Sequence, residues 1–124
     1  MNNIRPKHLA LSQIKLPLPG FVSILHRISG LLLFFALPAL LLMLQYSLRS
    51  IETYTQLMDV LAHPLTKLLL IGLGWAAMHH FCAGLRFIAI DLHYVRNLAQ
   101  ARFTSKIVLV AGVLLTVWVG IKLW

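Results

Sequence analysis

Three long apolar runs, separated by polar segments, set the pattern of this chain. Each run holds close to 20 residues with hardly a charged side chain among them. About 20 consecutive apolar residues in a helix cross the ~30 Å hydrocarbon core of a bilayer. We therefore predict three membrane-spanning helices, over about 22–48, 65–91 and 105–124. Pro38 lies inside the first and should kink it locally, which membrane helices tolerate when neighbouring groups satisfy the freed carbonyl.

The polar segments between these runs differ in charge. Residues 1–20 form a basic, proline-containing arm that we expect to be irregular, because proline removes a backbone donor and restrains the residue before it. Residues 49–63 are close to neutral and are expected to form a polar connection, whereas 91–106 carry three basic residues against Asp91. Basic loops favour the cytoplasmic side, so the N-terminus is predicted to be cytoplasmic and the C-terminus to lie on the far side.

Composition agrees with this interpretation. The chain is 60% hydrophobic and 11% charged, and its mean hydropathy is +0.85. Soluble domains are typically about 45–50% apolar and about 25% charged, so a small aqueous globule is excluded. The predicted fold class is an all-α membrane protein, a single anchor domain over 1–124 with three transmembrane helices and an irregular N-terminal arm.

The net charge of +8 does not indicate nucleic-acid binding. The basic residues lie between the apolar runs rather than along one face, which is the distribution of a membrane orientation signal. Cys82 is the only cysteine, so an intrachain disulfide and a metal-binding cysteine pair are both excluded.

The predicted topology brings ionisable side chains of different helices to similar depths. One group belongs near the cytoplasmic edge and comprises Ser23, His26, Arg27, Arg86 and Asp91. His80 precedes Arg86 by six residues, which is ~9 Å deeper at 1.5 Å per residue. Ionisable groups inside a membrane are costly, so each is a candidate functional residue.

His80 has two possible roles. It could hydrogen-bond a neighbouring helix, or its neutral imidazole could be an axial ligand to haem iron. Gly84 follows one turn later and leaves room for a flat ring, although small residues also permit close helix packing. His79 points about 100° away, so one chain would supply one ligand and another subunit the second.

The edge group also allows alternatives. Ser23 and Arg27 share a helix face and could hold the carbonyl oxygen of a head group entering from the lipid. His26 and Arg27 could instead receive carboxylates such as haem propionates, while Arg27 alone could simply extend to the membrane surface. Arg86 could bind a propionate or a lipid phosphate.

Two motifs resemble signatures of the cytochrome b membrane-anchor subunit (C subunit) of succinate dehydrogenase, complex II. They are Ser23-Ile24-Leu25-His26-Arg27-Ile28-Ser29-Gly30 and His80-x-x-x-Gly84-Leu85-Arg86 with Asp91, and Arg5-Pro6-x-x-Leu9-x-Leu11 is similar to the family's arm. Phe87 departs from the family pattern, which often has a histidine there.

The resemblance implies partners, cofactors and roles. A second small membrane-anchor subunit, an iron–sulfur subunit and a flavoprotein subunit would complete the complex in a bacterial inner membrane, with a mitochondrial inner membrane as the alternative. His80 would be one axial ligand to haem b, and Ser23 and Arg27 would line the ubiquinone site. His26, Arg27 and Arg86 are assigned to the propionates.

No catalytic activity is expected from the isolated chain, which lacks a flavin-binding fingerprint. The alternatives are the anchor of a quinol:fumarate reductase and a haem-free structural membrane protein.

Overall fold

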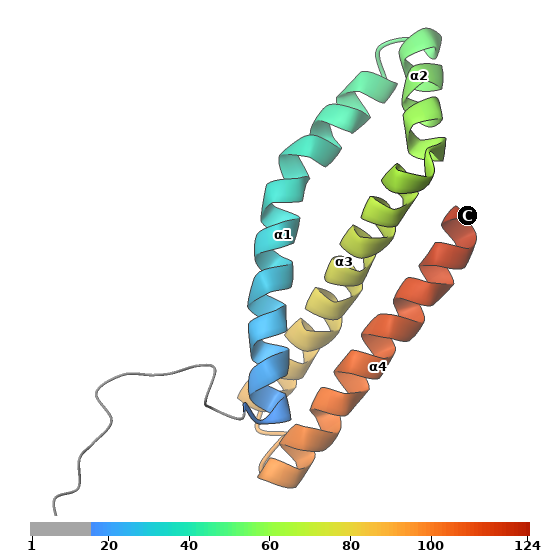
Figure 1. Ribbon diagram of the computed structural model, residues 1–124. Coiled ribbons are helices and arrows are strands. Elements are labelled where there is room, and N and C mark those ends of the chain that lie inside the picture. Colours follow the sequence, from blue (N-terminus) through green and yellow to red (C-terminus); the bar gives the residue numbers. More distant parts are fainter. Residues whose placement is uncertain (1–15) are drawn as a thin grey trace, which may run out of the picture.

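The computed structural model describes residues 16–124 and consists of four helices joined by short connections (Figure 1). They are α1 (Leu18–Ser47), α2 (Ile51–Ala62), α3 (Pro64–Asp91) and α4 (Leu98–Leu123). Three of them, Leu18–Ser47, Pro64–Asp91 and Leu98–Lys122, are long and apolar enough to cross a membrane. The predicted all-α fold with three membrane-length helices is confirmed. Most of the predicted arm, residues 1–15, lies outside the described part of the chain.

Helix α1 begins within the segment that was expected to be irregular. Pro17 is its N-cap and Pro19 lies in its first turn. The first turn of a helix has backbone N–H groups without partners, so a proline there costs no hydrogen bond. Pro38 lies inside α1 without ending it.

Helix α2 was not predicted, because its segment was interpreted as a polar connection between two apolar runs. It is started by a capping box in which the Ser50 side chain accepts from the Thr53 backbone N–H at 3.1 Å and Thr53 Oγ1 accepts from the Ser50 N–H at 3.0 Å. Such reciprocal bonds satisfy two donors that a helix start leaves free. Tyr46 then links α1 to α2 by donating to Gln56 Oε1 at 2.6 Å.

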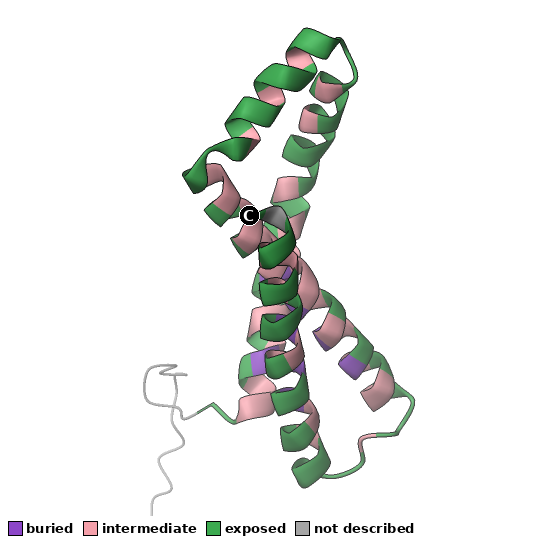
Figure 2. Cartoon of the chain, turned by 90° about the vertical axis from the view of Figure 1, so that its right-hand side faces the viewer, coloured by how far each residue is buried: buried purple, intermediate pink, exposed green. Residues whose placement is uncertain are grey.

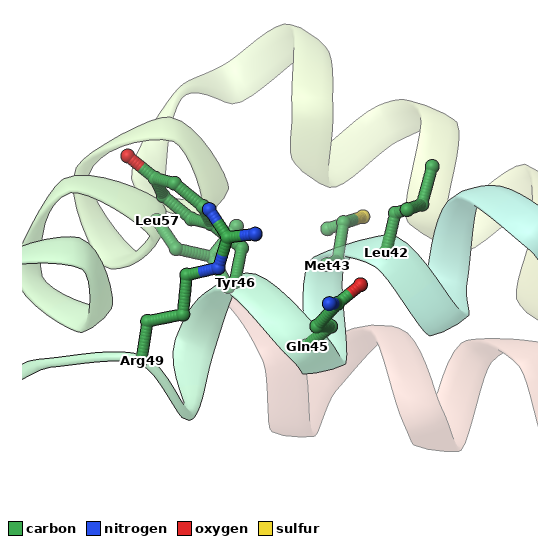
Figure 3. Close-up of a pocket in the computed structure, with 6 residues that line it drawn as sticks. All are labelled: Leu42, Met43, Gln45, Tyr46, Arg49 and Leu57. Atoms are coloured by element: carbon green, nitrogen blue, oxygen red, sulfur yellow. The ribbon is translucent and has the colours of Figure 1, made fainter.

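Helices α1 and α3 lie further apart toward the α2 end of the molecule than near the α3–α4 connection (Figure 1). Helix α3 lies between α1 and α4 in Figure 1, and it packs against both. At the α2 end, an open hollow of about 350 Å³ is lined by residues of α1, α2 and their connection, among them Tyr46, Leu57 and Arg49 (Figure 3).

Buried residues are concentrated in the half of the bundle nearest the α3–α4 connection. Figure 2 shows the upper part as exposed or half-buried, with the buried positions confined to the part below it. Small apolar side chains form this core together with four polar ones, namely Ser29, His79, Arg86 and Ser105. Exposed apolar side chains such as Phe34 and Phe35 cover the rest, as expected where lipid or another membrane protein replaces water.

Candidate functional site

The His80 imidazole is held by a hydrogen bond to the backbone of α1. Its Nδ1 lies 3.0 Å from the His26 carbonyl oxygen. The Ser29 hydroxyl donates to the same carbonyl at 2.9 Å and lies 3.3 Å from Nδ1. A carbonyl only accepts, so Nδ1 must carry the proton, and Nε2 of the neutral ring is left with its lone pair. This tautomer is the one that can bind a metal ion through Nε2.

His26 covers one face of this imidazole. The two rings stack with centroids 4.2 Å apart and planes 11° from parallel. The ring of Phe87 lies 5.1 Å from the His26 ring, so the position that departs from the family signature packs against this histidine. His26 Nε2 is enclosed without a hydrogen-bond partner within the described chain.

A glycine in α1 makes room for the His80 ring, and a second glycine, in α3, lies beside the His26 ring. A Cβ built on Gly30 would lie 2.8 Å from His80 Cε1 and 3.2 Å from Nδ1, which is too close without movement of the ring. A Cβ on Gly84 would lie 3.7 Å from His26 Nε2, an ordinary contact. Gly84 was expected to leave room for a flat ring, and the ring beside it is that of His26.

His79 is buried in the core, where residues of both α4 and α1 adjoin it. His79 is fully buried, and it stacks on Trp75 with centroids 5.3 Å apart. Its backbone lies beside Gly112 of α4, where an added Cβ would be 3.5 Å from the His79 Cα. Neither ring nitrogen of His79 has a partner among the described residues. The hydrogen bond to the His26 carbonyl of α1 belongs to His80, while the His79 ring lies near the Val22 backbone of the same helix.

Arg86 is directed toward α4. It is 6% exposed, and it donates from Nε to Thr104 Oγ1 at 3.1 Å and from Nη2 to the Ala101 carbonyl at 3.3 Å. It was expected to lie with His26 and Arg27, but its two bonds go to another interface. Its predicted propionate contact stays a prediction.

The remaining members of the edge group lie at the surface of this chain. Ser23 is half-buried, and Arg27 and Asp91 are exposed. Ser23 and Arg27 are one turn apart on α1, so they share a face of the helix. Their assigned quinone contacts also stay predictions.

Ser29, Gly30 and Thr104 were given no role from sequence. Ser29 and Gly30 lie inside the first signature, and their small size, three and four residues after His26, was an available signal for close packing. Thr104 had none, because its pairing with Arg86 depends on how α3 and α4 are rotated.

These features define a class of protein: an integral membrane protein of three spans with histidines packed between neighbouring helices. The family model described as "Succinate dehydrogenase/Fumarate reductase transmembrane subunit" matches residues 1–119, and the chain belongs to this family. It is a membrane-anchor subunit of the cytochrome b type, and it belongs to an enzyme complex with other subunits.

Bacterial relatives match this chain over all or nearly all of their length. The chain is 31% identical to the succinate dehydrogenase cytochrome b556 subunit of Coxiella burnetii (strain RSA 493 / Nine Mile phase I), over 100% of both chains. It is 32% identical to the subunit of the same name from Rickettsia felis (strain ATCC VR-1525 / URRWXCal2), over 94% of this chain and 93% of that one. The cytochrome b name of these relatives implies haem b.

Haem b requires few ligands from the protein, because the porphyrin supplies four nitrogens to the iron. One imidazole per chain with an available nitrogen is sufficient. His80 Nε2 makes no hydrogen bond and is not enclosed by the described residues, so it is available to a ligand. The described residues contain no cluster of three or more His, Cys, Asp or Glu that could hold a bare metal ion. The residues present therefore fit a haem ligand at His80.

Proposed function

We propose that this chain anchors a succinate:ubiquinone oxidoreductase in the bacterial inner membrane, with its N-terminus cytoplasmic and its C-terminus periplasmic. In this proposal it holds haem b together with a second small anchor subunit and forms part of the quinone-reduction site. A flavoprotein subunit and an iron–sulfur subunit complete the complex. The observation that carries the proposal is the fixed tautomer of His80, with Nδ1 on the His26 carbonyl at 3.0 Å.

His80 would provide one axial ligand through Nε2. The haem, when bound, supplies a centre that accepts and releases one electron. The hydrogen bond to the His26 carbonyl orients the imidazole, as partners of metal-binding histidines generally do. His26 and Arg27 would lie near the haem propionates, where the exposed Arg27 guanidinium can pair with a carboxylate.

Ser23 and Arg27 would position the quinone. A hydroxyl and a guanidinium one turn apart can both donate to a carbonyl oxygen of the head group, and the charge favours the developing negative charge as the quinone is reduced. Electrons from succinate would arrive through the flavin and iron–sulfur clusters of the partner subunits. The contribution of this chain is to bind and orient the head group at the membrane edge.

The family description also names fumarate reductase, so an anchor of a quinol:fumarate reductase is the second candidate. The two candidates share architecture and differ in physiological direction. The ratio of succinate oxidation to fumarate reduction, measured on one purified complex with a matched quinone and quinol, distinguishes them.

Replacement of the ligand tests the haem assignment. His80→Ala in the assembled complex is expected to abolish or strongly shift the reduced-minus-oxidised b-type spectrum. His79→Ala is the matched control, because both ring nitrogens of this neighbouring histidine are enclosed by the described residues, and it should retain the spectrum. An unchanged spectrum in His80→Ala, or a complex without haem in the unmodified protein, would contradict the assignment and favour a structural role.

A further inference from the structure

Arg86 carries a buried positive charge that its neighbours leave unneutralised. Arg86 donates two hydrogen bonds, and both acceptors, Thr104 Oγ1 and the Ala101 carbonyl, are neutral. The third nitrogen, Nη1, makes no hydrogen bond and is not one of the enclosed unpartnered atoms, so it reaches the surface of the chain. A charge in a membrane protein is expensive unless an opposite charge or water meets it.

An apolar groove of about 310 Å³ adjoins this charge between α3 and α4. Its walls are mainly hydrocarbon and include Leu85, Ala89, Ile107 and Ala111, with Arg86 and Thr104 as its polar members. Lys106, which is exposed, lines a neighbouring hollow that shares Ile107 and Ala111. The groove therefore combines apolar walls with the positive charges of Arg86 and the nearby Lys106.

The depth of Arg86 suits a lipid head group. Arg86 precedes the end of α3 at Asp91 by five residues, or ~7.5 Å at 1.5 Å per residue. The polar head-group layer is about 5–7 Å thick on each side of the hydrocarbon core. An arginine at this position can reach a phosphate at the membrane boundary, while the groove extends from it toward the membrane centre.

We propose that the α3–α4 groove binds one anionic phospholipid. The phosphate would accept a charge-assisted hydrogen bond from Arg86 Nη1, and one acyl chain would lie against Leu85, Ile107 and Ala111. Charge complementarity selects an anionic lipid, since a zwitterionic head group brings its own cation. The inference rests on the membrane location of the chain; it competes with the propionate contact predicted for Arg86 and is independent of the His80 ligand and quinone assignments.

Native mass spectrometry of the intact complex, purified in mild detergent and exchanged against lipid, tests the proposal. The probes are phosphatidylglycerol and phosphatidylcholine at equal concentration. Wild type should retain phosphatidylglycerol preferentially. Arg86→Gln should lower its retention about tenfold or more, because a hydrogen bond to a charged group contributes that much to an equilibrium. The control Arg102→Gln removes the same charge from an exposed position of α4 and should retain the lipid.

A second variant leaves the bonds of Arg86 intact. Ala111→Phe fills the apolar part of the groove and should lower retention without loss of charge. The proposal would be overturned if wild type retained both lipids equally, or if Arg86→Gln and Arg102→Gln retained phosphatidylglycerol equally. It would also be overturned if no lipid were bound at all, because a partner subunit would then cover the groove. A changed haem spectrum in Arg86→Gln with lipid retention unchanged would assign Arg86 to a propionate instead.

Discussion

At the scale of single residues, the His80 imidazole depends on a residue that has no side chain. Gly30 lies opposite the ring across the α1–α3 interface, and the space that a Cβ would take is already filled by Cε1. The glycine thus allows the ring to approach α1 closely enough for its bond to the His26 carbonyl. The hydrogen bond from His80 to the His26 carbonyl therefore requires a residue without a Cβ at position 30.

Gly30→Ala tests this dependence. The added methyl would lie 2.8 Å from His80 Cε1, so the ring must move, and overpacking of this kind costs about 1–3 kcal/mol. We expect reduced haem content and a shifted b-type spectrum in the purified complex. Gly72→Ala is the control, because an added Cβ there meets nothing within 4 Å in this chain. Normal haem content in Gly30→Ala would show that the His80 ring does not hold this position in the complex.

Arg27 carries the prediction for the quinone site. Removal of one charge-assisted hydrogen bond by Arg27→Ala is expected to lower ubiquinone reduction by about tenfold to a hundredfold, since such bonds contribute about 1.5–3 kcal/mol. Succinate-dependent reduction of a soluble electron acceptor should be unchanged, because the soluble subunits remain intact. Arg102→Ala serves as an exposed control of the same charge. Unaltered quinone reductase activity and inhibitor sensitivity in Arg27→Ala would exclude the assigned role.

At the scale of elements, the three long helices follow from the lengths of the apolar runs, which is why they could be predicted. Helix α2 depends on its capping box and on the bond from Tyr46 to Gln56. These are local interactions of polar side chains, and hydropathy alone does not register them. The Ser50 and Thr53 pair was nevertheless present in the sequence as a start signal.

Ser50→Ala should loosen α2 without affecting the membrane helices. Loss of an N-cap costs about 0.5–2 kcal/mol, so backbone amides at the start of α2 should exchange with deuterium several-fold to tens of times faster. Thr55→Ala is the control, because its hydroxyl bonds only the Glu52 carbonyl within the helix. Protection of α2 that is equal in the two variants would mean that other contacts, such as that of Tyr46, hold the helix.

At the scale of the whole molecule, the histidine site is incomplete within the described chain. The ring of His26 lies parallel to that of His80 at 4.2 Å, so it cannot also bind a metal ion on the far side of a haem from His80. His79 is fully buried with both ring nitrogens enclosed, and His63 and His93 lie outside the ends of α3. A second axial ligand is therefore expected from a partner subunit.

Expression with and without the second anchor subunit tests this expectation. The six-coordinate b-type spectrum should appear only when both anchors are present, and the two should co-purify in mild detergent with the soluble subunits. A six-coordinate spectrum from this chain alone would contradict the shared site and would indicate either a second ligand within the chain or a homo-oligomer.

The amino-acid sequence by itself determined the membrane class, the number of long helices and the candidate histidine. Run length and residue spacing are properties of a single segment, and the spacing of His80 to Gly84 does not depend on what surrounds it. Only the tertiary structure decided which neighbour each polar side chain meets. Arg86 was grouped by depth with His26, yet it bonds Thr104, while His80 bonds the His26 carbonyl. Depth follows from position along one helix, whereas partners depend on how each helix is rotated about its axis, which packing against the others determines.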